Sequence, residues 1–599
     1  MADARITRPS RWRALLDLLW QAGRVRATVF GGLILVAGLL PTGVILLTGR
    51  LVAAIPAAVQ PGTAGLRPAL TALAALAGCL ALLGLAVTAL AQLSRALDAA
   101  FTLEVHHRVA RVMLGTPGLA PLEDPRLADE LHAIQDAERR GVLRQTMAAL
   151  SNVATMRLRG LGAFVVLFAF EWWAPLVLAA AWHLTNRVYL QATENGVSVN
   201  MSDGAVRLRR AEYLRSLALE APAAKEVRVF GLGGWLVGRY GDAWLEALGV
   251  MWRSRRANRA ITAAAAVALA LSHAAVLGAL ALAATRGEVS GAALMVFVPA
   301  VIATADLGII GDWQWFLAQS MAVAERVAGL RARVASTLAA GGAGASTAPA
   351  VSTRSTERAG SAGSKASHGR IASTASNAAA ASDLDPGTRG GPVSVRLRDV
   401  CFTYRGRETP TLDGLTLDVP AGQSLAIVGE NGAGKSTLIK LLCGLYEPER
   451  GRITLDGGQT PLQARRRIGV IFQDFVRYPF SLRENVAVGS LPLAGDEDAL
   501  RAALADAGGA ALLAGMPRGW DTVLSREYED GVDLSGGQWQ RVALARALAA
   551  VRGGAGLLIL DEPTAALDVR AEAELFDRFL AVTRGITTIL VSHRLSSVR

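Results

Sequence analysis

Lysine, cysteine and acidic charge are all scarce in this chain of 599 residues. Only four lysines stand among 62 basic residues, so arginine supplies almost all of the formal net charge of +12. The three cysteines, Cys79, Cys401 and Cys443, form an odd and scattered set. Their spacing excludes a disulfide framework and a cysteine-ligated metal site, and we expect three small core residues with no redox role. The basic first 26 residues lack a short apolar core with a cleavage site, so we expect no cleavable signal peptide.

Apolar residues, in contrast, are abundant. They make up 52% of the chain, its mean hydropathy is +0.34, and they concentrate in the first half. Six runs there can each supply the roughly 20 apolar residues that cross a hydrocarbon core of about 30 Å. The predicted spans are about 25–55, 66–97, 147–170, 173–190, 260–284 and 289–317.

The arginines follow the connections between these spans. The two long connections, 99–146 and 191–259, are rich in arginine, and so is the segment 1–24. The short connections are poor in it, and this asymmetry predicts that the long loops and both termini face the cytoplasm. We therefore expect an integral, multi-pass protein of the cytoplasmic membrane. A basic balance can also indicate nucleic acid, but no recognition motif accompanies it, so we expect no nucleic-acid partner.

The composition changes again between 341 and 391, where Ser, Ala, Gly and Thr dominate. Such a stretch cannot bury enough surface to offset its ordering entropy. We predict a helical membrane domain over 25–340, a disordered linker over 341–392 and a second domain over 393–599. The linker is interpreted as a spacer, with a regulatory tail as the alternative.

One motif organises the second domain. The residues from Gly429 to Thr437 fit G-x-x-x-x-G-K-[ST], between the strand-like run 424–428 and the helix-like run 438–442. This context predicts a P-loop, whose backbone N–H groups cradle phosphates, although a Gly-rich turn that binds nothing is the alternative. Lys435 would reach the β- and γ-phosphates, and Ser436 would hold Mg²⁺. The predicted nucleotide ligands here are Gly429, Asn431, Gly432, Ala433, Gly434, Lys435, Ser436 and Thr437.

Two further stretches fit phosphoryl transfer. The apolar run 556–560 predicts a buried strand that delivers Asp561 for Mg²⁺ and Glu562 as the general base. Leu534–Gln538 reads Leu-Ser-Gly-Gly-Gln ahead of a predicted helix. That arrangement predicts a second anion-binding helix N-terminus, with an ordinary helix cap as the alternative.

In their order along the chain, these motifs resemble the nucleotide-binding domain of ABC transporters. The expected fold is therefore an α-helical membrane domain followed by an α/β P-loop domain with a mixed sheet and a helical signature subdomain. The resemblance adds Tyr404 as the aromatic that stacks on adenine, Gln473 of the Q-loop, Asp568 of the D-loop and the switch residue His593. It also assigns the signature residues Ser535, Gly536, Gly537 and Gln538 to nucleotide binding.

The resemblance further implies a half-size exporter that binds ATP and Mg²⁺. In that family the signature of one subunit covers the γ-phosphate held by the other, so we expect a homodimer, with a heterodimer possible. Glu562, Gln473 and His593 would be the catalytic residues, and Ser436, Gln473 and Asp561 the metal ligands. The substrate would be an amphipathic or hydrophobic drug, peptide or lipid. The alternatives are a membrane-anchored ATPase that regulates a partner or channel without pumping, an importer, and a P-loop enzyme tethered to lipid.

Several features depart from the family or lie outside its motifs. The chain ends six residues after His593, where the family continues, so we expect a truncated sequence. The acidic stretch 527–531 is atypical of the family. Helical tips of the long loops, including 225–232, are the predicted couplers. Asp306, His183 and His273 fall inside predicted spans, where ionisable groups are costly and often functional, although some could lie in water beyond the bilayer.

Overall fold

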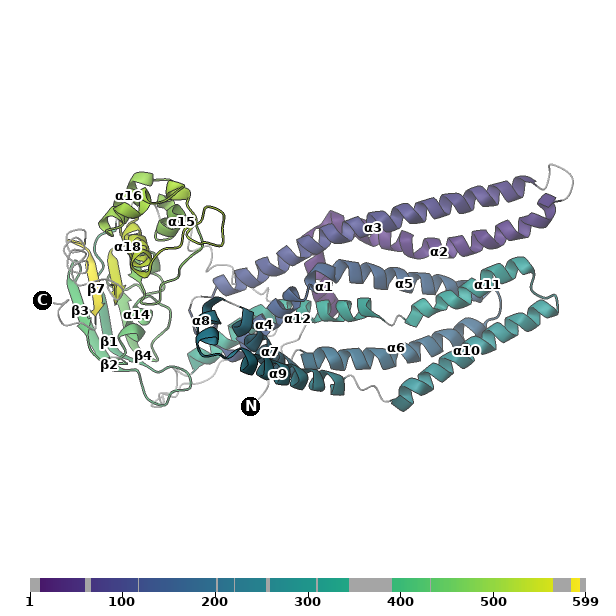
Figure 1. Cartoon of the computed structure of the whole chain (residues 1–599), viewed down its shortest axis with the longest axis horizontal. Coiled ribbons are helices and arrows are strands. Elements are labelled where there is room, and N and C mark those ends of the chain that lie inside the picture. Colours follow the sequence, from purple (N-terminus) through teal and green to yellow (C-terminus); the bar gives the residue numbers. More distant parts are fainter. Residues whose placement is uncertain are drawn as a thin grey trace, which may run out of the picture. The chain divides into compact units, whose positions relative to one another are not determined.

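The computed structural model describes residues 11–59, 66–116, 118–200, 203–219, 221–254, 259–308, 311–343, 390–430, 432–563 and 583–592. Its contacts divide the chain into two compact units. Unit 1 comprises Met1–Met113 and Pro125–Val334, and unit 2 comprises Leu114–Asp124 and Ala335–Arg599. Figure 1 colours both units along the sequence, and each is described below by itself.

Unit 1 consists of helices in the described residues. In chain order they are α1 (Arg11–Ala22), α2 (Arg24–Val59), α3 (Leu66–Leu114), α4 (Pro125–Arg139), α5 (Thr146–Leu167), α6 (Trp173–Asn200), α7 (Asp203–Leu219), α8 (Ala221–Val229), α9 (Gly233–Ser254), α10 (Arg259–Thr285), α11 (Gly291–Ala303) and α12 (Asp312–Ala343). A 3-10 turn, η1 (Leu143–Gln145), precedes α5.

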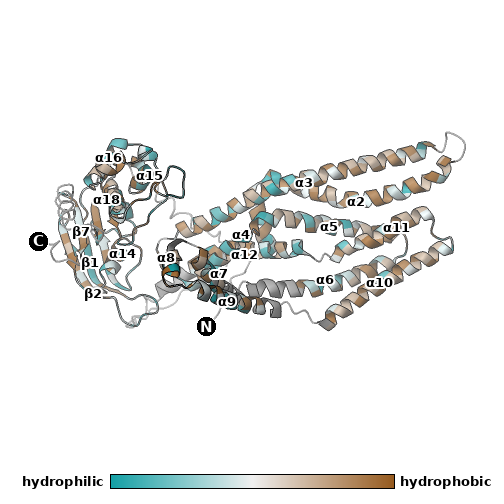
Figure 2. Cartoon of the chain, viewed as in Figure 1, coloured by the Kyte–Doolittle hydropathy of each residue, from teal (hydrophilic) through white to brown (hydrophobic). Residues whose placement is uncertain are grey.

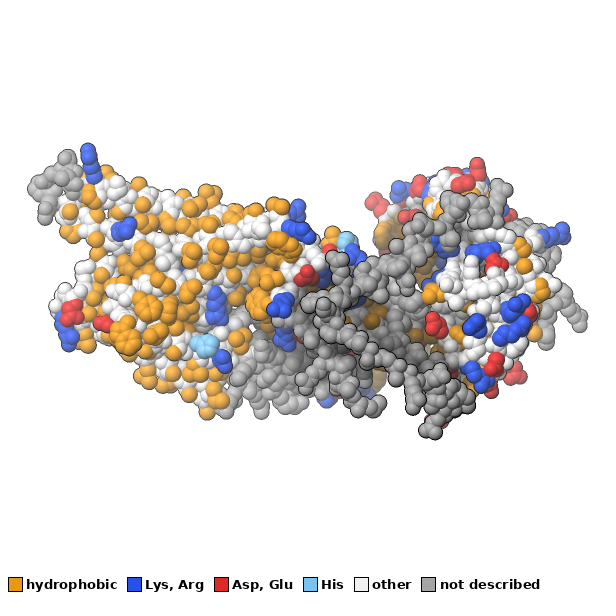
Figure 3. All heavy atoms as spheres, turned by 180° about the vertical axis from the view of Figure 1, so that it is seen from behind, with side chains coloured by type: hydrophobic (Ala, Val, Ile, Leu, Met, Phe, Trp, Pro, Cys, Tyr) orange, Lys and Arg blue, Asp and Glu red, His pale blue; other side chains and the backbone are white. Residues whose placement is uncertain are grey.

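In the described part of the chain, four helical stretches are long and apolar enough to cross a membrane. They are Arg24–Val59, Leu66–Leu114, Ala260–Thr285 and Gly291–Ser336, and their brown colouring in Figure 2 shows the apolar runs. Orange hydrophobic side chains cover much of the described face of this unit in Figure 3. Helices also form at the predicted third and fourth spans, as α5 and α6. They are less apolar and are not among these four stretches, so their crossing of the membrane stays a prediction.

Small residues let the apolar helices approach closely. Gly38 of α2 lies against Leu158 of α5, where an added Cβ would come within 2.6 Å of the Leu158 Cβ. Close backbone contacts of this kind are how helices associate where no hydrophobic driving force separates protein from lipid. The close position of α2 beside α5 therefore depends on glycine at position 38, which has no side chain.

The sixth apolar stretch is interrupted, where the sequence predicted one continuous span over 289–317. Helix α11 ends at Ala303, the 3-10 segment η2 follows over Thr304–Gly308, and α12 begins at Asp312. Pro299 within α11 removes one helical hydrogen-bond donor shortly before this break. A 3-10 segment inside a helical stretch commonly marks a hinge or strain.

Unit 2 contains two sheets in the described residues. An antiparallel sheet has the order β2-β1-β4, and a parallel sheet has the order β3-β7-β6-β5. The strands are β1 (Val395–Phe402), β2 (Leu412–Val419), β3 (Ser424–Val428), β4 (Arg450–Leu455), β5 (Ile468–Ile471), β6 (Leu557–Asp561) and β7 (Thr587–Ser592). The predicted α/β fold is confirmed, and its antiparallel and parallel strands form two sheets in the described residues.

Strand β6 is buried on both faces. Leu557 and Ile559 pack with β1, β4 and the helix α14 (Lys435–Leu442). Leu558 and Leu560 pack with a helical subdomain. Its helices are α15 (Leu482–Ala487), α16 (Glu497–Asp506), α17 (Ala510–Ala514) and α18 (Gly536–Arg552). A fully apolar run covered on both sides is typical of a central parallel strand.

The short segment Leu114–Asp124, between α3 and α4, packs within unit 2 rather than unit 1. The Leu119 N–H donates to the Leu445 carbonyl at 2.9 Å. Tyr446 Oη donates to the Glu123 carboxylate, and Arg405 pairs with Asp124 at 3.6 Å. We did not predict this docking from the sequence, which singled out 225–232 instead; that stretch overlaps α8 in unit 1, and its coupling role stays a prediction.

The structure describes the chain on either side of the predicted linker. Helix α12 continues to Ala343, past the predicted start at 341, and β1 begins at Val395. Residues 344–389 lie outside the described part of the chain. Among the free cysteines only Cys443 is buried, so the expectation of three core cysteines is wrong for Cys79 and Cys401, which are partly exposed.

Candidate nucleotide-binding site

The predicted P-loop joins β3 to α14, as the motif requires. Gly432 and Gly434 have φ values of +89° and +87°, a left-handed conformation that glycine adopts without strain. An added Cβ on Gly434 would lie 2.9 Å from the Thr411 carbonyl oxygen. The loop therefore needs glycine there both for its dihedral angle and for space. Lys435 Nζ donates to the carbonyls of Gly429 and Glu430 at 2.7 and 2.8 Å.

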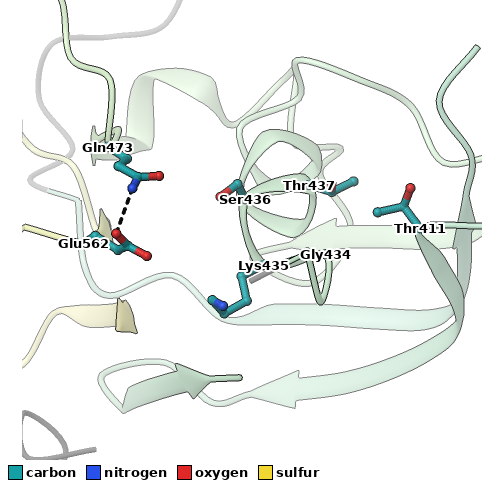
Figure 4. Close-up of a pocket in the computed structure, with 8 residues that line it drawn as sticks. Thr411, Gly434, Lys435, Ser436, Thr437, Gln473 and Glu562 are labelled. Carbon is teal, nitrogen blue, oxygen red and sulfur yellow. Dashed lines mark hydrogen bonds between the residues drawn. The ribbon is translucent and has the colours of Figure 1, made fainter. Parts of the chain in front are cut away.

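A cavity of about 390 Å³ opens over this loop (Figure 4). Its volume lies in the range of small-molecule sites. Seven predicted site residues line it, and Thr411 completes the wall. The lining residues are Thr411, Gly432, Gly434, Lys435, Ser436, Thr437, Gln473 and Glu562. The wall thus combines donors for phosphate with an amide and a carboxylate on the opposite side.

Gln473 and Glu562 face each other across that opposite side, as Figure 4 shows. Gln473 Nε2 donates to Glu562 Oε2 at 2.8 Å, although 89 positions separate the two residues in the chain. Glu562 has a φ of +48°, which is uncommon for a residue with a side chain. Its backbone N–H donates to the Val591 carbonyl at 3.1 Å. Strained backbone that persists at a pocket is typical of functional sites.

The parallel sheet brings these groups together. Val428 of β3 pairs with Ser592 of β7, and Asp561 of β6 pairs with Val591. The carboxyl ends of three neighbouring strands therefore meet at one edge, which is where α/β sheets bind ligands. His593 follows Ser592 directly, but its own position lies outside the described residues.

Asp561 and Ser436 supply oxygen ligands suited to Mg²⁺. Burial raises the pKa of Asp561, a hydrogen bond with Ser436 lowers it in part, and the nearby Glu562 and Asp474 carboxylates raise it further. A bound cation would offset this crowding of negative charge. Within the described residues no three His, Cys, Asp or Glu side chains converge on a metal site. Mg²⁺ would therefore complete its shell with phosphate and water oxygens, as it usually does.

Tyr404 lies beside the cavity rather than in its wall. Its hydroxyl is 3.2 Å from Thr437 Oγ1, and its ring meets the Phe402 and Tyr446 rings edge-on. The ammonium of Lys440 lies 5.8 Å from the Tyr404 ring centroid. The predicted stacking on adenine stays a prediction, because the described contacts of Tyr404 are with its own domain.

The signature residues cap α18 and do not line the cavity. Ser535 Oγ accepts from the Gln538 N–H at 3.4 Å, and Gln538 Oε1 accepts from the Ser535 N–H at 2.8 Å. This reciprocal pair is a capping box. The signature residues therefore do form a helix cap, which was the alternative to an anion-binding site. Gly536 and Gly537 open the helix, and neither is among the residues that line the cavity.

Arg546 of α18 is a site-supporting residue that sequence analysis missed. Its guanidinium donates to the carbonyls of Val476 and Asn485 at 2.7 and 2.8 Å and stacks 4.8 Å from the Tyr478 ring centroid. Burial lowers the pKa of Arg546 to about 10. The segment that follows Gln473 is therefore tied to the helix that carries the signature.

Three predicted site residues, Asn431, Asp568 and His593, lie outside the described part of the chain. Two residues that the motifs did not indicate do belong to the site's surroundings: Thr411 in the wall, and Tyr446 behind Tyr404. No motif marks either residue, because their roles depend on contacts between distant segments.

Comparison with known proteins shows which family the second half of the chain resembles. Residues 412–565 match the family model described as ABC transporter. The chain is 37% identical over 210 residues to the nisin transport ATP-binding protein NisT of Lactococcus lactis, covering 34% of each. It is 39% identical over 224 residues to an ATP-dependent lipid A-core flippase of Thiobacillus denitrificans, covering 36% of this chain and 38% of that protein.

A third relative, the subtilin transport ATP-binding protein SpaT of Bacillus subtilis, is 37% identical over 210 residues. The chain matches only about a third of the length of these curated relatives. The family match agrees with two features of the structure. These are the P-loop between β3 and α14 and the hydrogen bond between Gln473 and Glu562. Residues 412–565 therefore form an ATP-binding domain similar to those of ABC transporters, joined in this chain to a region of apolar helices.

Proposed function

We propose that the chain is one half of an ATP-driven exporter of an amphipathic or hydrophobic molecule in the cytoplasmic membrane. The observation that carries this proposal is the cavity in which Lys435 and Ser436 face Gln473 and Glu562. Apolar helices long enough to cross a membrane stand on the same chain. The relatives support export in general, since they are named as nisin and subtilin transport proteins and a lipid A-core flippase.

Hydrolysis follows from the residues at the cavity. Lys435 and the backbone N–H groups of the loop stabilise charge on the β- and γ-phosphates. Glu562 accepts a proton from the attacking water, and Gln473 positions that carboxylate through its amide. Mg²⁺ held by Ser436, Gln473 and Asp561 would neutralise charge on the phosphate oxygens. The family's switch residue, His593, would orient the γ-phosphate.

A second copy would complete the site. The signature residues Ser535 and Gly537 are absent from the wall of their own chain's cavity, yet the exposed N-terminus of α18 is suited to phosphate. Pairing two chains head to tail would bring each signature over the other chain's P-loop. ATP would favour the closed pair by its higher affinity for that state, and hydrolysis would release it.

The segment 114–124 provides a route from ATP to the helices of unit 1. Thr437 in the cavity wall contacts Tyr404, Tyr404 meets Tyr446 edge-on, and Tyr446 holds Glu123. Burial and the Glu123 carboxylate raise the pKa of Tyr446, so its hydroxyl stays protonated and keeps donating. Because 114–124 joins α3 to α4 directly, movement at the nucleotide reaches those helices through the backbone.

The test measures ATP-dependent movement of a molecule across a membrane in one direction. The purified chain is reconstituted in sealed vesicles, and a labelled amphipathic molecule is followed after ATP is added outside. We expect movement that requires ATP and stops with Glu562→Gln. Steady ATP hydrolysis without movement, across a broad panel of amphipathic molecules, would instead favour an ATPase that regulates a partner.

A further inference from the structure

The break in the sixth apolar stretch is wedged between α5 and α6. Gly160 of α5 lies against η2, where an added Cβ would be 2.8 Å from the Leu307 nitrogen. Gly308 of η2 lies against the Trp182 ring of α6. Both contacts exclude larger residues, so the position of the irregular segment is fixed by the neighbouring helices.

The break lies deep in the proposed membrane region. Arg159 is eight residues before the end of α5 at Leu167, and Trp182 is nine residues after the start of α6 at Trp173. At 1.5 Å per residue these offsets are roughly 12–14 Å from the short connection between the two helices. That depth falls inside a hydrocarbon core of about 30 Å. Irregular backbone is tolerated there only where protein or a cavity surrounds it.

An ion pair holds the break. Arg159 Nε donates to the Asp306 carboxylate, whose side chain is only 10% exposed, whereas the Arg159 side chain is 42% exposed. Among the described residues Arg159 has no other hydrogen-bond partner. Both of its Nη nitrogens therefore remain available, and they form the planar donor fork that fits a carboxylate or phosphate.

Positive charge exceeds negative charge in this region. The helices α5, α6 as far as 190, α10 from 260, α11 with η2, and the first turn of α12 contain three arginines and two acids. They are Arg157, Arg159, Arg187, Asp306 and Asp312. Unbalanced charge is costly at membrane depth and marks a functional position. An anion from outside this set would remove the imbalance.

Polar atoms beside the break also lack partners in the described structure. Trp182 Nε1 and Gln314 Oε1 are buried and make no hydrogen bond there. The other end of the Gln314 amide donates to Asn186 Oδ1 at 3.2 Å. Unsatisfied buried groups of this kind call for a water molecule or a ligand.

We propose that Arg159 binds an anionic group, a carboxylate or phosphate, of the exported amphipathic molecule at the break in the sixth apolar stretch. Asp306 orients the guanidinium and competes with the incoming anion. This inference rests on the proposed export function and narrows its substrate class to anionic amphipathic molecules.

The experiment uses the full chain in vesicles of phosphatidylcholine, so that the bilayer brings no net charge. Three probes share one alkyl chain: dodecyl phosphate, dodecylphosphocholine and dodecyltrimethylammonium. ATP hydrolysis and movement of each probe are measured against concentration. We expect dodecyl phosphate to act at the lowest half-maximal concentration, by about tenfold over the cation, as one charge-assisted hydrogen bond would give.

The variants separate binding from structural support. Arg159→Gln should raise the half-maximal concentration of dodecyl phosphate about tenfold, whereas Asp306→Asn should lower it, because the competing carboxylate is gone. A purely structural ion pair would give losses of the same sign for both variants. Arg157→Gln is the matched control: it removes the same charge two positions away on α5, on the opposite side of the helix. Arg159→Lys serves as a second variant that keeps the charge and loses the fork.

The outcomes distinguish the two proposals. If neither these probes nor the broad panel of amphipathic molecules moves or stimulates hydrolysis, the export proposal itself fails. If the probes move without preference for the anion, or if Arg157→Gln matches Arg159→Gln, export stands and the assignment of Arg159 is overturned.

Discussion

The P-loop and the break in the sixth apolar stretch are two irregular backbone segments with different origins. In the P-loop, Gly432 and Gly434 take left-handed dihedral angles that few other residues adopt. In η2 none of the residues Thr304–Gly308 has a positive φ, and the shape depends on Gly160, Trp182 and Arg159 of other helices. One irregularity is encoded locally, and the other is imposed by packing.

This difference has a consequence for where each segment can change. A loop specified by its own glycines keeps its geometry through domain movement. A segment held by an ion pair and two tight contacts can rearrange when a neighbour moves or when a ligand competes for the arginine. The predictions below test these two kinds of irregularity, in order of expected effect.

The largest effect should come from Glu562→Gln. The carboxylate acts on water, so ATP hydrolysis should fall by about 100-fold to 10,000-fold while ATP binding persists. Hydrolysis and binding of a fluorescent ATP analogue are the two measurements. Glu447→Gln, which changes an exposed acid of the same domain, is the control, and hydrolysis at the wild-type rate in Glu562→Gln would contradict the assignment.

Lys435→Ala should weaken nucleotide binding itself. Loss of a charged hydrogen bond to phosphate is worth about 1.5–3 kcal/mol, or roughly 10–100-fold in the dissociation constant. Titration with the same fluorescent analogue measures it. Because the loop geometry is set by glycine, the fold should be unaffected, and unchanged thermal unfolding in Lys435→Ala is the accompanying check.

Gly160→Ala tests the packed irregularity. The new methyl group would press on the Leu307 nitrogen, so we expect a loss of about 1–3 kcal/mol in stability. Gly84→Ala on α3 is the matched control, since nothing lies within 4 Å of its added Cβ; it should be neutral or stabilising by up to about 1 kcal/mol. Thermal unfolding in detergent compares them, and equal shifts for both variants would show that η2 is not held by this contact.

Acidification should inhibit hydrolysis earlier than an ordinary aspartate would allow. The pKa of Asp561 is raised, chiefly by burial, so the carboxyl takes up a proton and loses Mg²⁺ at a higher pH than a solvated carboxyl. Because proton and cation compete, more Mg²⁺ should move this loss to lower pH. Hydrolysis is measured against pH at two Mg²⁺ concentrations; a midpoint independent of Mg²⁺ would exclude Asp561 as the titrating ligand.

The smallest effect should come from Tyr446→Phe. Removing the hydroxyl leaves Glu123 without this donor, so the stimulation of hydrolysis by transported molecules should fall a few-fold, corresponding to roughly 1 kcal/mol, while basal hydrolysis is kept. Arg405→Gln is the control because its ion pair with Asp124 is long and more exposed. Equal effects of the two variants would place the coupling elsewhere.

Seven of the predicted site residues line one cavity, and the sequence could indicate them because their motifs are local. A glycine-rich turn after a buried strand, and acids at the end of another strand, carry their meaning in consecutive residues. Thr411, Tyr446 and Arg546 were missed because each acts through a contact with a distant segment. The break after Ala303 was missed for the same reason: the run 289–317 is apolar throughout much of its length, and besides Pro299 the break depends on contacts with Arg159, Gly160 and Trp182 on other helices.

Because lysine is scarce, Lys435 in the P-loop is one of few side chains that an amine-specific reagent can modify. Two of the four primary amines on side chains, Lys435 and Lys440, lie within one turn and a half of a single helix, and the first already engages two carbonyls of its own loop. In the purified protein an amine-acylating reagent would meet only Lys225, Lys365 and the N-terminal amine besides these two lysines. A peptide map that separates Lys435 from the others would therefore report nucleotide occupancy as protection of one amine, while arginine stays inert to the reagent.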